Sequence, residues 1–303
     1  MLTAIGDNPL AEPGSPYRRH FLGHSIRRDE KKAIELNPKL SHAYRWLGSA
    51  YTGLGFYDAA IVPIKEAIRL EPCNDQGHSL LGRVYWLGKG MIDEGITEFQ
   101  HAVGLNPEAG YSFLQLGFLH TLKGDYDRAE EACRRAIDLQ EKYMSGKEGL
   151  KIIGGHTRLG YAYYRQGRYQ DAINEYNKEQ AFLSSSDHGL RERTMIELNQ
   201  KLGAAYLRLG NEAEADSHFA AALAGFEERV AKGADDPFTK YYIASVYALR
   251  NKPDEAIKYF EETLGMLGAL NKSRVQIDPD FDHIRQDPRF IELLSRPLLE
   301  TRH

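Results

Sequence analysis

Residues 41–74 read SHAYRWLGSAYTGLGFYDAAIVPIKEAIRLEPCN and decide the fold of this chain. The first half of the stretch places large and small residues along one side of a helix, at Tyr44, Leu47, Gly48 and Tyr51. The glycine in this stripe is small enough to let two helices approach closely. One helical hairpin cannot bury such a stripe alone, so the stretch predicts several stacked copies.

The second half of the stretch predicts another helix, with an apolar stripe that includes Ala60 and Ile64 and a stop at Pro72. The turn between the two helices contains Gly55-Phe56-Tyr57-Asp58. We expect Gly55 to end the first helix and the side chain of Asp58 to cap the second one.

The same spacing returns down the chain. Further Leu-Gly or Ile-Ala pairs begin at residues 81, 116, 159, 202 and 243, and each is followed by a second apolar stripe. The later pairs lie further apart than the earlier ones, which predicts longer helices in the second half of the chain. The unit that starts at residue 75 holds an extra residue between Tyr85 and Gly95, and Glu179 stands where the pattern has alanine.

This pattern resembles the tetratricopeptide repeat, a helix-turn-helix unit of about 34 residues. The resemblance covers roughly residues 21–294 and implies an all-α, right-handed superhelical α-solenoid. Residues 1–20 are expected to be a poorly ordered lead-in, and residues 21–40 a degenerate half repeat. Six repeats are expected at residues 41–74, 75–109, 110–145, 150–186, 190–231 and 236–270.

The C-terminal residues 277–303 resemble the helical cap that closes many bacterial members of this family. Two Asp-Pro pairs, Asp278-Pro279 and Asp287-Pro288, are each suited to a capping aspartate followed by proline at the first helical position. Phe281 and Phe290 are then expected to cover the exposed stripe of the last repeat.

Composition excludes some classes of partner. A formal net charge of -4 gives no electrostatic argument for nucleic acid or an anionic membrane. Residues 1–16 lack the basic start and apolar core of a secretory signal. Cys73 and Cys133 have no metal-binding spacing, and Cys133 falls on a core-facing position, so a buried free thiol and a cytoplasmic location are expected.

The resemblance implies a binding groove on the concave side, lined by the first helix of each repeat. Four arginines against one glutamate, Glu197, make this side cationic, with aromatic residues between the arginines. Such a surface suits a peptide segment with acidic and apolar side chains, because arginine binds carboxylates bidentately and aromatic rings offer rigid contact area. The candidate groove residues are Arg45, Arg83, Trp86, Tyr111, Phe118, Tyr161, Tyr164, Arg165, Arg208 and Tyr241.

Each candidate has a structural alternative. The aromatic residues could pack against neighbouring helices inside a tight superhelix. Arg45, Arg83 and Arg165 could be solvated and paired with local glutamates.

Members of the family that hold chaperone C-termini use a clamp of lysine, asparagine and arginine at fixed positions of successive repeats. The corresponding positions of the first three repeats hold Arg45, Ser49, Leu80, Tyr111 and Gln115. The resemblance therefore gives little support for recognition of a free C-terminal carboxylate.

Catalytic and metal motifs are weak in this sequence. His20 and His24 are four residues apart but have no third ligand nearby, so an exposed pair is expected. The adjacent glycines Gly154 and Gly155 belong to no phosphate-binding motif and are better explained by the start of a helix. We expect no enzymatic activity, no cofactor and no metal.

The alternating carboxylates Asp278, Asp280 and Asp282 lack the glycine and glutamate of a calcium loop, so helix capping is the preferred explanation.

Two functions remain. The first is a non-catalytic scaffold or adaptor that binds a peptide segment of another protein in the concave groove. The second is a regulatory or assembly module that self-associates, with the degenerate N-terminal half repeat docking on another copy to form a homo-oligomer.

Overall fold

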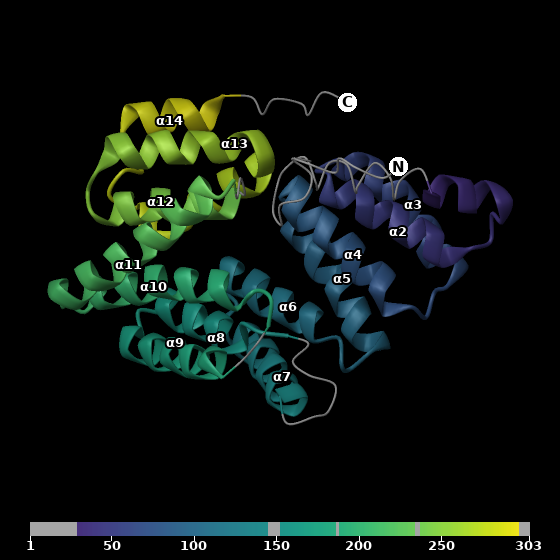
Figure 1. The fold of residues 1–303 in the computed structure, drawn as a ribbon, viewed down its shortest axis with the longest axis horizontal. Helices are drawn as coiled ribbons and strands as arrows, with labels where there is room; N and C mark the ends of the chain where they lie inside the picture. Colours follow the sequence, from purple (N-terminus) through teal and green to yellow (C-terminus); the bar gives the residue numbers. More distant parts are fainter. Residues whose placement is uncertain (1–28, 145–151, 186–187, 234–236, 297–303) are drawn as a thin grey trace, which may run out of the picture.

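The computed structural model describes residues 29–144, 152–185, 188–233 and 237–296, and these ranges contain helices and turns but no strand (Figure 1). Residues 29–36 are helical. The helices that follow are α2 (Ser41–Gly53), α3 (Tyr57–Leu70), α4 (Asp75–Arg83), η1 (Val84–Gly88), α5 (Ile92–Leu105), α6 (Gly110–Lys123), α7 (Tyr126–Met144), α8 (Gly155–Arg165), α9 (Tyr169–Ser184), α10 (Arg191–Arg208), α11 (Glu212–Ala231), α12 (Pro237–Leu249), α13 (Pro253–Val275), η2 (Pro279–Phe281) and α14 (Pro288–Ser295).

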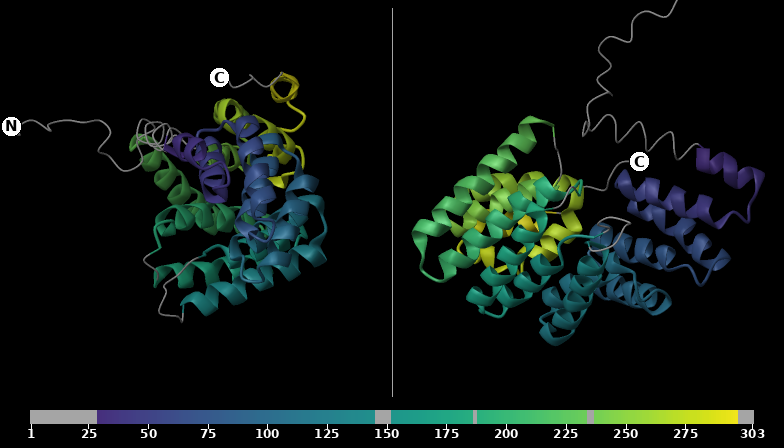
Figure 2. Two further views of the ribbon diagram at one scale, coloured as in Figure 1. Left: turned by 90° about the vertical axis from the view of Figure 1, so that its right-hand side faces the viewer. Right: turned by 60° about the horizontal axis from the view of Figure 1, so that its bottom comes forward.

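Consecutive helices pack in pairs from α2 with α3 to α12 with α13, and each pair packs against the next one. The chain therefore winds as a right-handed superhelical α-solenoid, as the sequence predicts (Figures 1 and 2). The superhelix curls so tightly that α13 contacts η1, far back along the chain.

The glycine of each Leu-Gly pair sets the distance between the two helices of a hairpin. A Cβ atom on Gly48 would lie 2.3 Å from Cγ1 of Ile64, and one on Gly160 would lie 2.5 Å from Cε1 of Tyr176. No real Cβ atom is found that close to a neighbour. The predicted role of glycine in close helix packing is thus confirmed.

The first turn confirms one expectation and corrects another. Gly55 follows α2 with a φ of 82°, in the left-handed region that glycine adopts without strain. The predicted cap at Asp58 is wrong, because α3 begins at Tyr57 and its N-cap is Phe56, without a side-chain hydrogen bond. Asp58 lies in the first turn, where its charge favours the helix N-terminus, and it accepts a hydrogen bond from Nζ of Lys89 at 2.7 Å.

Departures from the repeat spacing have local structural causes. The extra residue between Tyr85 and Gly95 coincides with η1, a π-helical segment, which is the usual way for a helix to absorb one added residue. This segment buries Trp86 and Leu87. The wider spacing of the later pairs corresponds to longer helices, with 20 residues in α11 and 23 in α13 against 13 in α2.

The C-terminal residues cover the last helical pair. Asp278 and Asp287 each accept a hydrogen bond from a backbone N–H two residues ahead, and proline follows each of them. Phe281 and Phe290 stack on each other and pack against Phe260 of α13. All three rings have no exposed surface.

A further expectation concerns the cysteine Cys133. Cys133 is a free thiol with no exposed surface, and burial raises its pKa to about 12. The buried free thiol is thus confirmed.

The lead-in at residues 1–20, most of the half repeat and the pair His20 and His24 lie outside the described residues. In the part of the chain that the structure describes, no helix is long and apolar enough to cross a bilayer.

The glycine contacts predict opposite effects for two Gly→Ala substitutions. Gly160→Ala should lower the free energy of unfolding by about 1–3 kcal/mol, because the new methyl group overlaps the buried ring of Tyr176. Gly104→Ala in α5 should raise it by up to about 1 kcal/mol, because nothing lies within 4 Å and alanine favours a helix. Urea unfolding followed by circular dichroism measures both changes, and equal effects would contradict the packing role of Gly160.

Candidate functional site

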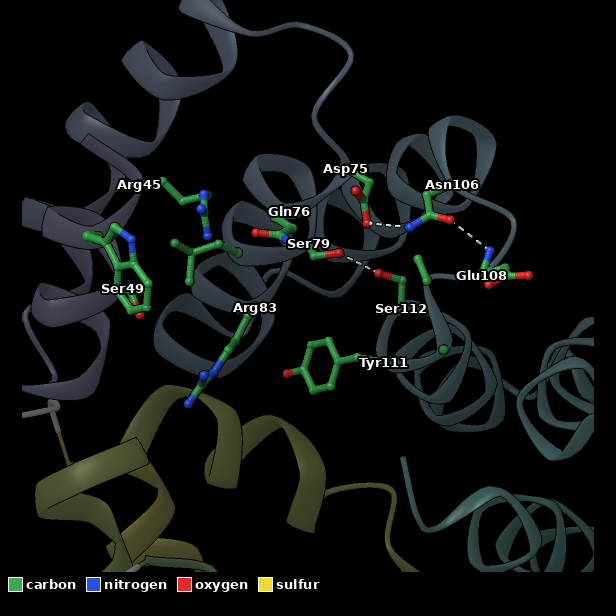
Figure 3. Close-up of a pocket in the computed structure, with 14 residues that line it drawn as sticks. Arg45, Ser49, Asp75, Gln76, Ser79, Arg83, Asn106, Glu108, Tyr111 and Ser112 are labelled. Atoms are coloured by element: carbon green, nitrogen blue, oxygen red, sulfur yellow. Dashed lines mark hydrogen bonds between the residues drawn. The ribbon is translucent and has the colours of Figure 1, made fainter. Parts of the chain in front are cut away.

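The concave side contains an open groove between α2, α4 and α6, which we call the N-terminal groove (Figure 3). It encloses a cavity of about 390 Å³. Side chains from three successive first helices converge on it, including Arg45, Ser49, Gln76, Ser79, Arg83, Tyr111 and Ser112.

Hydrogen bonds fix the polar edge of this groove. The Oγ atoms of Ser79 and Ser112 lie 2.5 Å apart and join α4 to α6. Nδ2 of Asn106 donates to Asp75 at 3.2 Å, and Oδ1 of Asn106 accepts from the backbone N–H of Glu108 at 2.9 Å (Figure 3). These side chains are therefore held in place before any ligand arrives.

The arginines of the N-terminal groove differ in exposure. Arg83 is exposed, and Arg45 is half-buried with its guanidinium 5.6 Å from the ring centre of Trp46. Nε of Arg45 has no hydrogen-bond partner. The alternative of pairing with local glutamates is wrong for Arg45, Arg83 and Arg165, since none of them forms an ion pair with another described residue.

The C-terminal half of the concave side is occupied by the chain itself. Asp278 caps η2 and Asp280 lies within it, and both side chains turn into the superhelix. The hydroxyl of Tyr164 donates to Oδ1 of Asp280 at 2.7 Å, and that of Tyr241 donates to Oδ2 of Asp278 at 2.9 Å. Three predicted groove residues, Tyr161, Tyr164 and Tyr241, are at most 4% exposed and are not accessible to a partner in this conformation.

Further contacts hold the same segment. Nη2 of Arg208 donates to the carbonyl of Pro279 at 2.7 Å, and Nε2 of Gln200 donates to Asp280 at 3.0 Å. The buried guanidinium of Arg274 lies 3.5 Å from Asp278. The capping role expected for Asp278 is confirmed, but its contacts across the superhelix were not predicted.

Trp86, Phe118 and Arg165 also lie in the packed interior or at its edge. The rings of Trp86 and Phe118 meet edge to face with centres 5.7 Å apart, and both are at most 5% exposed. The ring centres of Phe118 and Tyr161 lie 5.9 Å apart. Nη1 of Arg165 donates to the hydroxyl of Tyr161 at 3.4 Å. The packing alternative is confirmed for these rings, whereas Tyr111 is 41% exposed.

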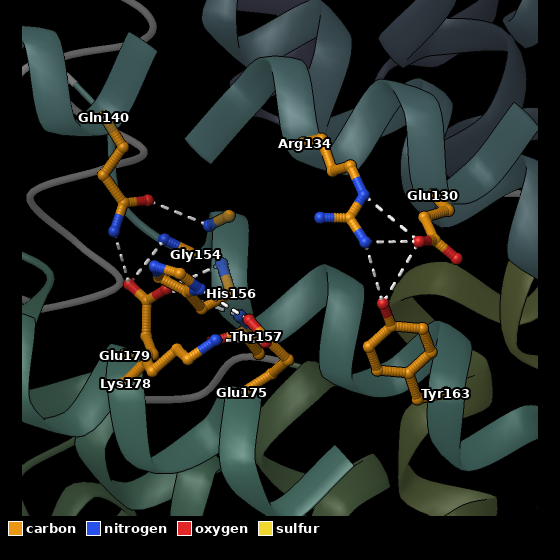
Figure 4. Close-up of polar contacts among 11 residues, drawn as sticks. Glu130, Arg134, Gln140, Gly154, His156, Thr157, Tyr163, Glu175, Lys178 and Glu179 are labelled. Carbon is orange, nitrogen blue, oxygen red and sulfur yellow. Dashed lines mark hydrogen bonds and ion pairs between the residues drawn. The ribbon is translucent and has the colours of Figure 1, made fainter. Parts of the chain in front are cut away.

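Glu179, the departure from alanine, caps the N-terminus of α8 (Figure 4). Its carboxylate accepts hydrogen bonds from the backbone N–H groups of Gly154 at 2.8 Å, His156 at 3.0 Å and Thr157 at 3.4 Å. Nε2 of Gln140 donates to it at 3.3 Å. Burial raises the pKa of Glu179, and the hydrogen bonds from Gly154, Gln140 and Thr157 and the charge of the His156 imidazole oppose that shift. The carboxylate thus satisfies N–H groups that a helix start leaves without partners.

The neighbouring residues have structural roles as well. Gly154 has a φ of 101°, and α8 starts at Gly155, as the paired glycines predict. Nδ1 of His156 and Nζ of Lys178 each lie 2.7 Å from Glu175 (Figure 4). In this region the described side chains form a helix cap and a salt-bridge network.

One group of side chains has a donor set that suits a metal ion. The ligand atoms of His78, Glu98 and His101 all lie within 4.8 Å of one another. Two imidazoles and a carboxylate are a set that zinc accepts. Here Nδ1 of His78 lies 2.7 Å from Glu98, and the two imidazole rings meet edge to face. No sequence motif marks this group, because its members lie on two helices, α4 and α5. The expectation of no metal stays a prediction.

The buried Asp280 predicts a pH dependence of stability. Burial, followed by repulsion from Asp278, raises the pKa of Asp280 to about 6, so the folded chain binds a proton that the unfolded chain releases. The stabilisation is present at about pH 4 and is lost as the pH rises through 6. Relative to Asp280→Asn, the wild type should lose about 3 kcal/mol between these limits, measured by urea unfolding across pH. A difference that does not vary with pH would contradict the assignment.

Comparison with known proteins tests the identity of the repeats. A family model described as the tetratricopeptide repeat matches residues 108–184 and 194–268, which span α6 to α9 and α10 to α13. The Hsp70-Hsp90 organising protein of Plasmodium falciparum is 28% identical over 101 residues, which are 33% of this chain and 17% of that protein. Tetratricopeptide repeat protein 37 of Xenopus laevis is 22% identical over 270 residues, 78% of this chain and 16% of that protein. This chain spans less than a fifth of either relative.

Solved structures agree on the fold. A tetratricopeptide repeat protein from Parabacteroides merdae superposes with a TM-score of 0.56 at 14% identity, over 83% of this chain and 92% of that one. The Cut9-Hcn1 hetero-tetramer of the APC/C gives a TM-score of 0.58 at 17% identity, over 90% of this chain and 46% of that one. At these identities the likeness concerns the fold alone. Because the family model covers half of the sequence and its matches coincide with the stacked helical pairs, this chain belongs to the tetratricopeptide repeat family.

Proposed function

We propose that this chain is a non-catalytic adaptor that binds a peptide segment of another protein in the N-terminal groove. The observation that carries the proposal is the pair Arg45 and Arg83 beside the exposed ring of Tyr111, with neither guanidinium in an ion pair with a described residue. Arginine without a carboxylate partner is well suited to bind one from a ligand. The exposed ring adds rigid apolar contact area.

We infer the chemistry of the ligand from the segment of this same chain, residues 278–281, that fills the C-terminal half of the concave side. In the C-terminal half, tyrosine hydroxyls bind the carboxylates of Asp278 and Asp280, Arg208 binds a backbone carbonyl, and the ring of Phe281 is buried. A partner segment with acidic and apolar side chains offers the same groups to the N-terminal groove. We also propose that the adaptor is cytoplasmic. We propose further that its C-terminal residues form the same kind of cap as in bacterial members of the family.

The family supports a scaffold role in general terms. The name of the Plasmodium relative describes an organiser of two other proteins, Hsp70 and Hsp90. The positions of the carboxylate clamp differ here, with Leu80 and Tyr111 in the groove and Gln115 buried. The proposed ligand is therefore an internal acidic segment rather than a free C-terminus.

Neutralising the groove arginines should weaken peptide binding. Peptides selected on the full chain from a displayed random library should be rich in acidic and apolar residues. Arg45→Gln with Arg83→Gln should weaken their binding at least about tenfold, because charge-assisted hydrogen bonds are lost. Fluorescence anisotropy measures the affinity.

Arg69→Gln on the outer helix α3 is the matched control, since Arg69 already pairs with Glu66 at 2.6 Å. Equal losses in the control and the double variant, or selection of peptides without acidic residues, would refute the proposal.

Self-association is a second candidate, supported by an apolar surface at the N-terminal end of the array. Leu36 is 78% exposed and Val62 is 74% exposed. A cavity of about 870 Å³ beside them is lined by Ile34, Tyr44 and Val62, among others. An open end of a repeat stack that exposes apolar side chains can dock on a second copy.

If the N-terminal end is a dimer interface, light scattering of the wild type should give a mass that rises towards twice that of the chain with concentration. Leu36→Glu combined with Val62→Glu should keep the mass at that of one chain, because two buried charges would oppose docking. A strict monomer at high concentration of the wild type would remove this candidate.

A further inference from the structure

A further cavity lies deeper in the superhelix, and we call it the central chamber. It encloses about 370 Å³ and is walled by α4, η1, α6, α8, α10, α12 and α13. Arg83 and Tyr111 line both the chamber and the N-terminal groove, so the two spaces adjoin. The inference below concerns the chamber alone and does not depend on peptide binding in the groove.

Cations dominate the wall of the chamber. Five of its lining side chains are cationic against one carboxylate, that of Glu197. Arg193 lies 2.7 Å from Glu197, and Arg274 lies 3.5 Å from Asp278. Arg83 and Arg158 form no ion pair within the described ranges of the chain. The chamber thus keeps an excess of positive charge.

Aromatic rings hold the cations in place. The guanidinium of Arg158 lies 4.3 Å from the ring centre of Phe118. Nζ of Lys201 lies 5.1 Å from the ring of Tyr161 and 4.9 Å from that of Tyr242. Such contacts position a cation without neutralising its charge. The charges are therefore preorganised for an anion.

Four buried polar atoms on chamber side chains have no hydrogen-bond partner. They are Nε1 of Trp86, Oε1 of Gln115, Oγ1 of Thr157 and Nε of Arg274, the last of which has only the ion pair with Asp278 at 3.5 Å. Each of these residues is at most 6% exposed. Native proteins rarely leave such atoms unsatisfied unless water, an ion or a ligand completes them. Their concentration around one cationic cavity points to a missing polar occupant.

We propose that the central chamber binds a small oxyanion, a molecule that carries phosphate or several carboxylates. Preorganised cations and N–H donors are the groups that bind such anions. The chamber volume is within the range of small-molecule pockets. An extended peptide is a poorer fit, because helices from both halves of the superhelix, including α13, enclose the space.

Calorimetric titration of the full chain with inorganic pyrophosphate and with citrate, at constant ionic strength, tests this proposal. At least one probe should bind saturably at a single site. Arg158→Gln should weaken that binding about tenfold, through loss of a charge-assisted contact. Arg45→Gln is the matched control, because Arg45 lines only the N-terminal groove and should leave the affinity unchanged.

The two titrations distinguish the kinds of oxyanion. Selective binding of pyrophosphate indicates a phosphate ligand, and selective binding of citrate indicates a polycarboxylate. If circular dichroism shows that Arg158→Gln does not fold, Lys201→Gln takes its place. Absence of saturable binding of both probes, or equal weakening by Arg45→Gln, overturns the proposal. Peptide binding should survive Arg158→Gln, so the chamber and the groove can fail separately.

Discussion

The burial of each hairpin's apolar stripe against the next hairpin is the constraint on which the rest of this structure depends. Within a hairpin, Gly160 lets the helices meet at the ring of Tyr176, and between hairpins the stripes merge into continuous clusters of buried side chains. A stack of this kind has two ends that cannot be buried in the same way. At the C-terminal end Phe281 and Phe290 close the stack, whereas Leu36 and Val62 stay exposed at the other end.

The closing segment also divides the concave side. Phe281 packs into the last pair, and this places Asp278 and Asp280 inside the superhelix, where burial of a carboxylate is costly without donors. Tyr164, Tyr241 and Gln200 supply those donors, and Arg274 adds an ion pair with Asp278, so the C-terminal half is filled by the chain itself. The N-terminal groove stays open because no described segment covers Arg83 or Tyr111.

Each of two departures from the repeat pattern coincides with a local feature of the structure, a π-helical turn in one case and a helix cap in the other. The extra residue in the second repeat becomes the π-helical turn η1, which buries Trp86 beside the central chamber. The glutamate in place of alanine, Glu179, caps α8, whose Thr157 and Arg158 line the same chamber. Both irregularities therefore lie next to the central chamber.

The sequence alone determined the helices, their pairing and the solenoid, because the spacing of Leu47, Gly48 and Ile64 is local and recurs along the chain, with Ile243-Ala244 in place of Leu-Gly in the last unit. It also identified Arg45, Arg83 and Tyr111, which the open groove brings together. The tertiary structure alone decided what fills the concave side. Tyr164 and Asp280 are 116 residues apart, and their contact depends on how tightly the superhelix curls. Curvature accumulates over many small packing angles, and no short stretch of sequence encodes it.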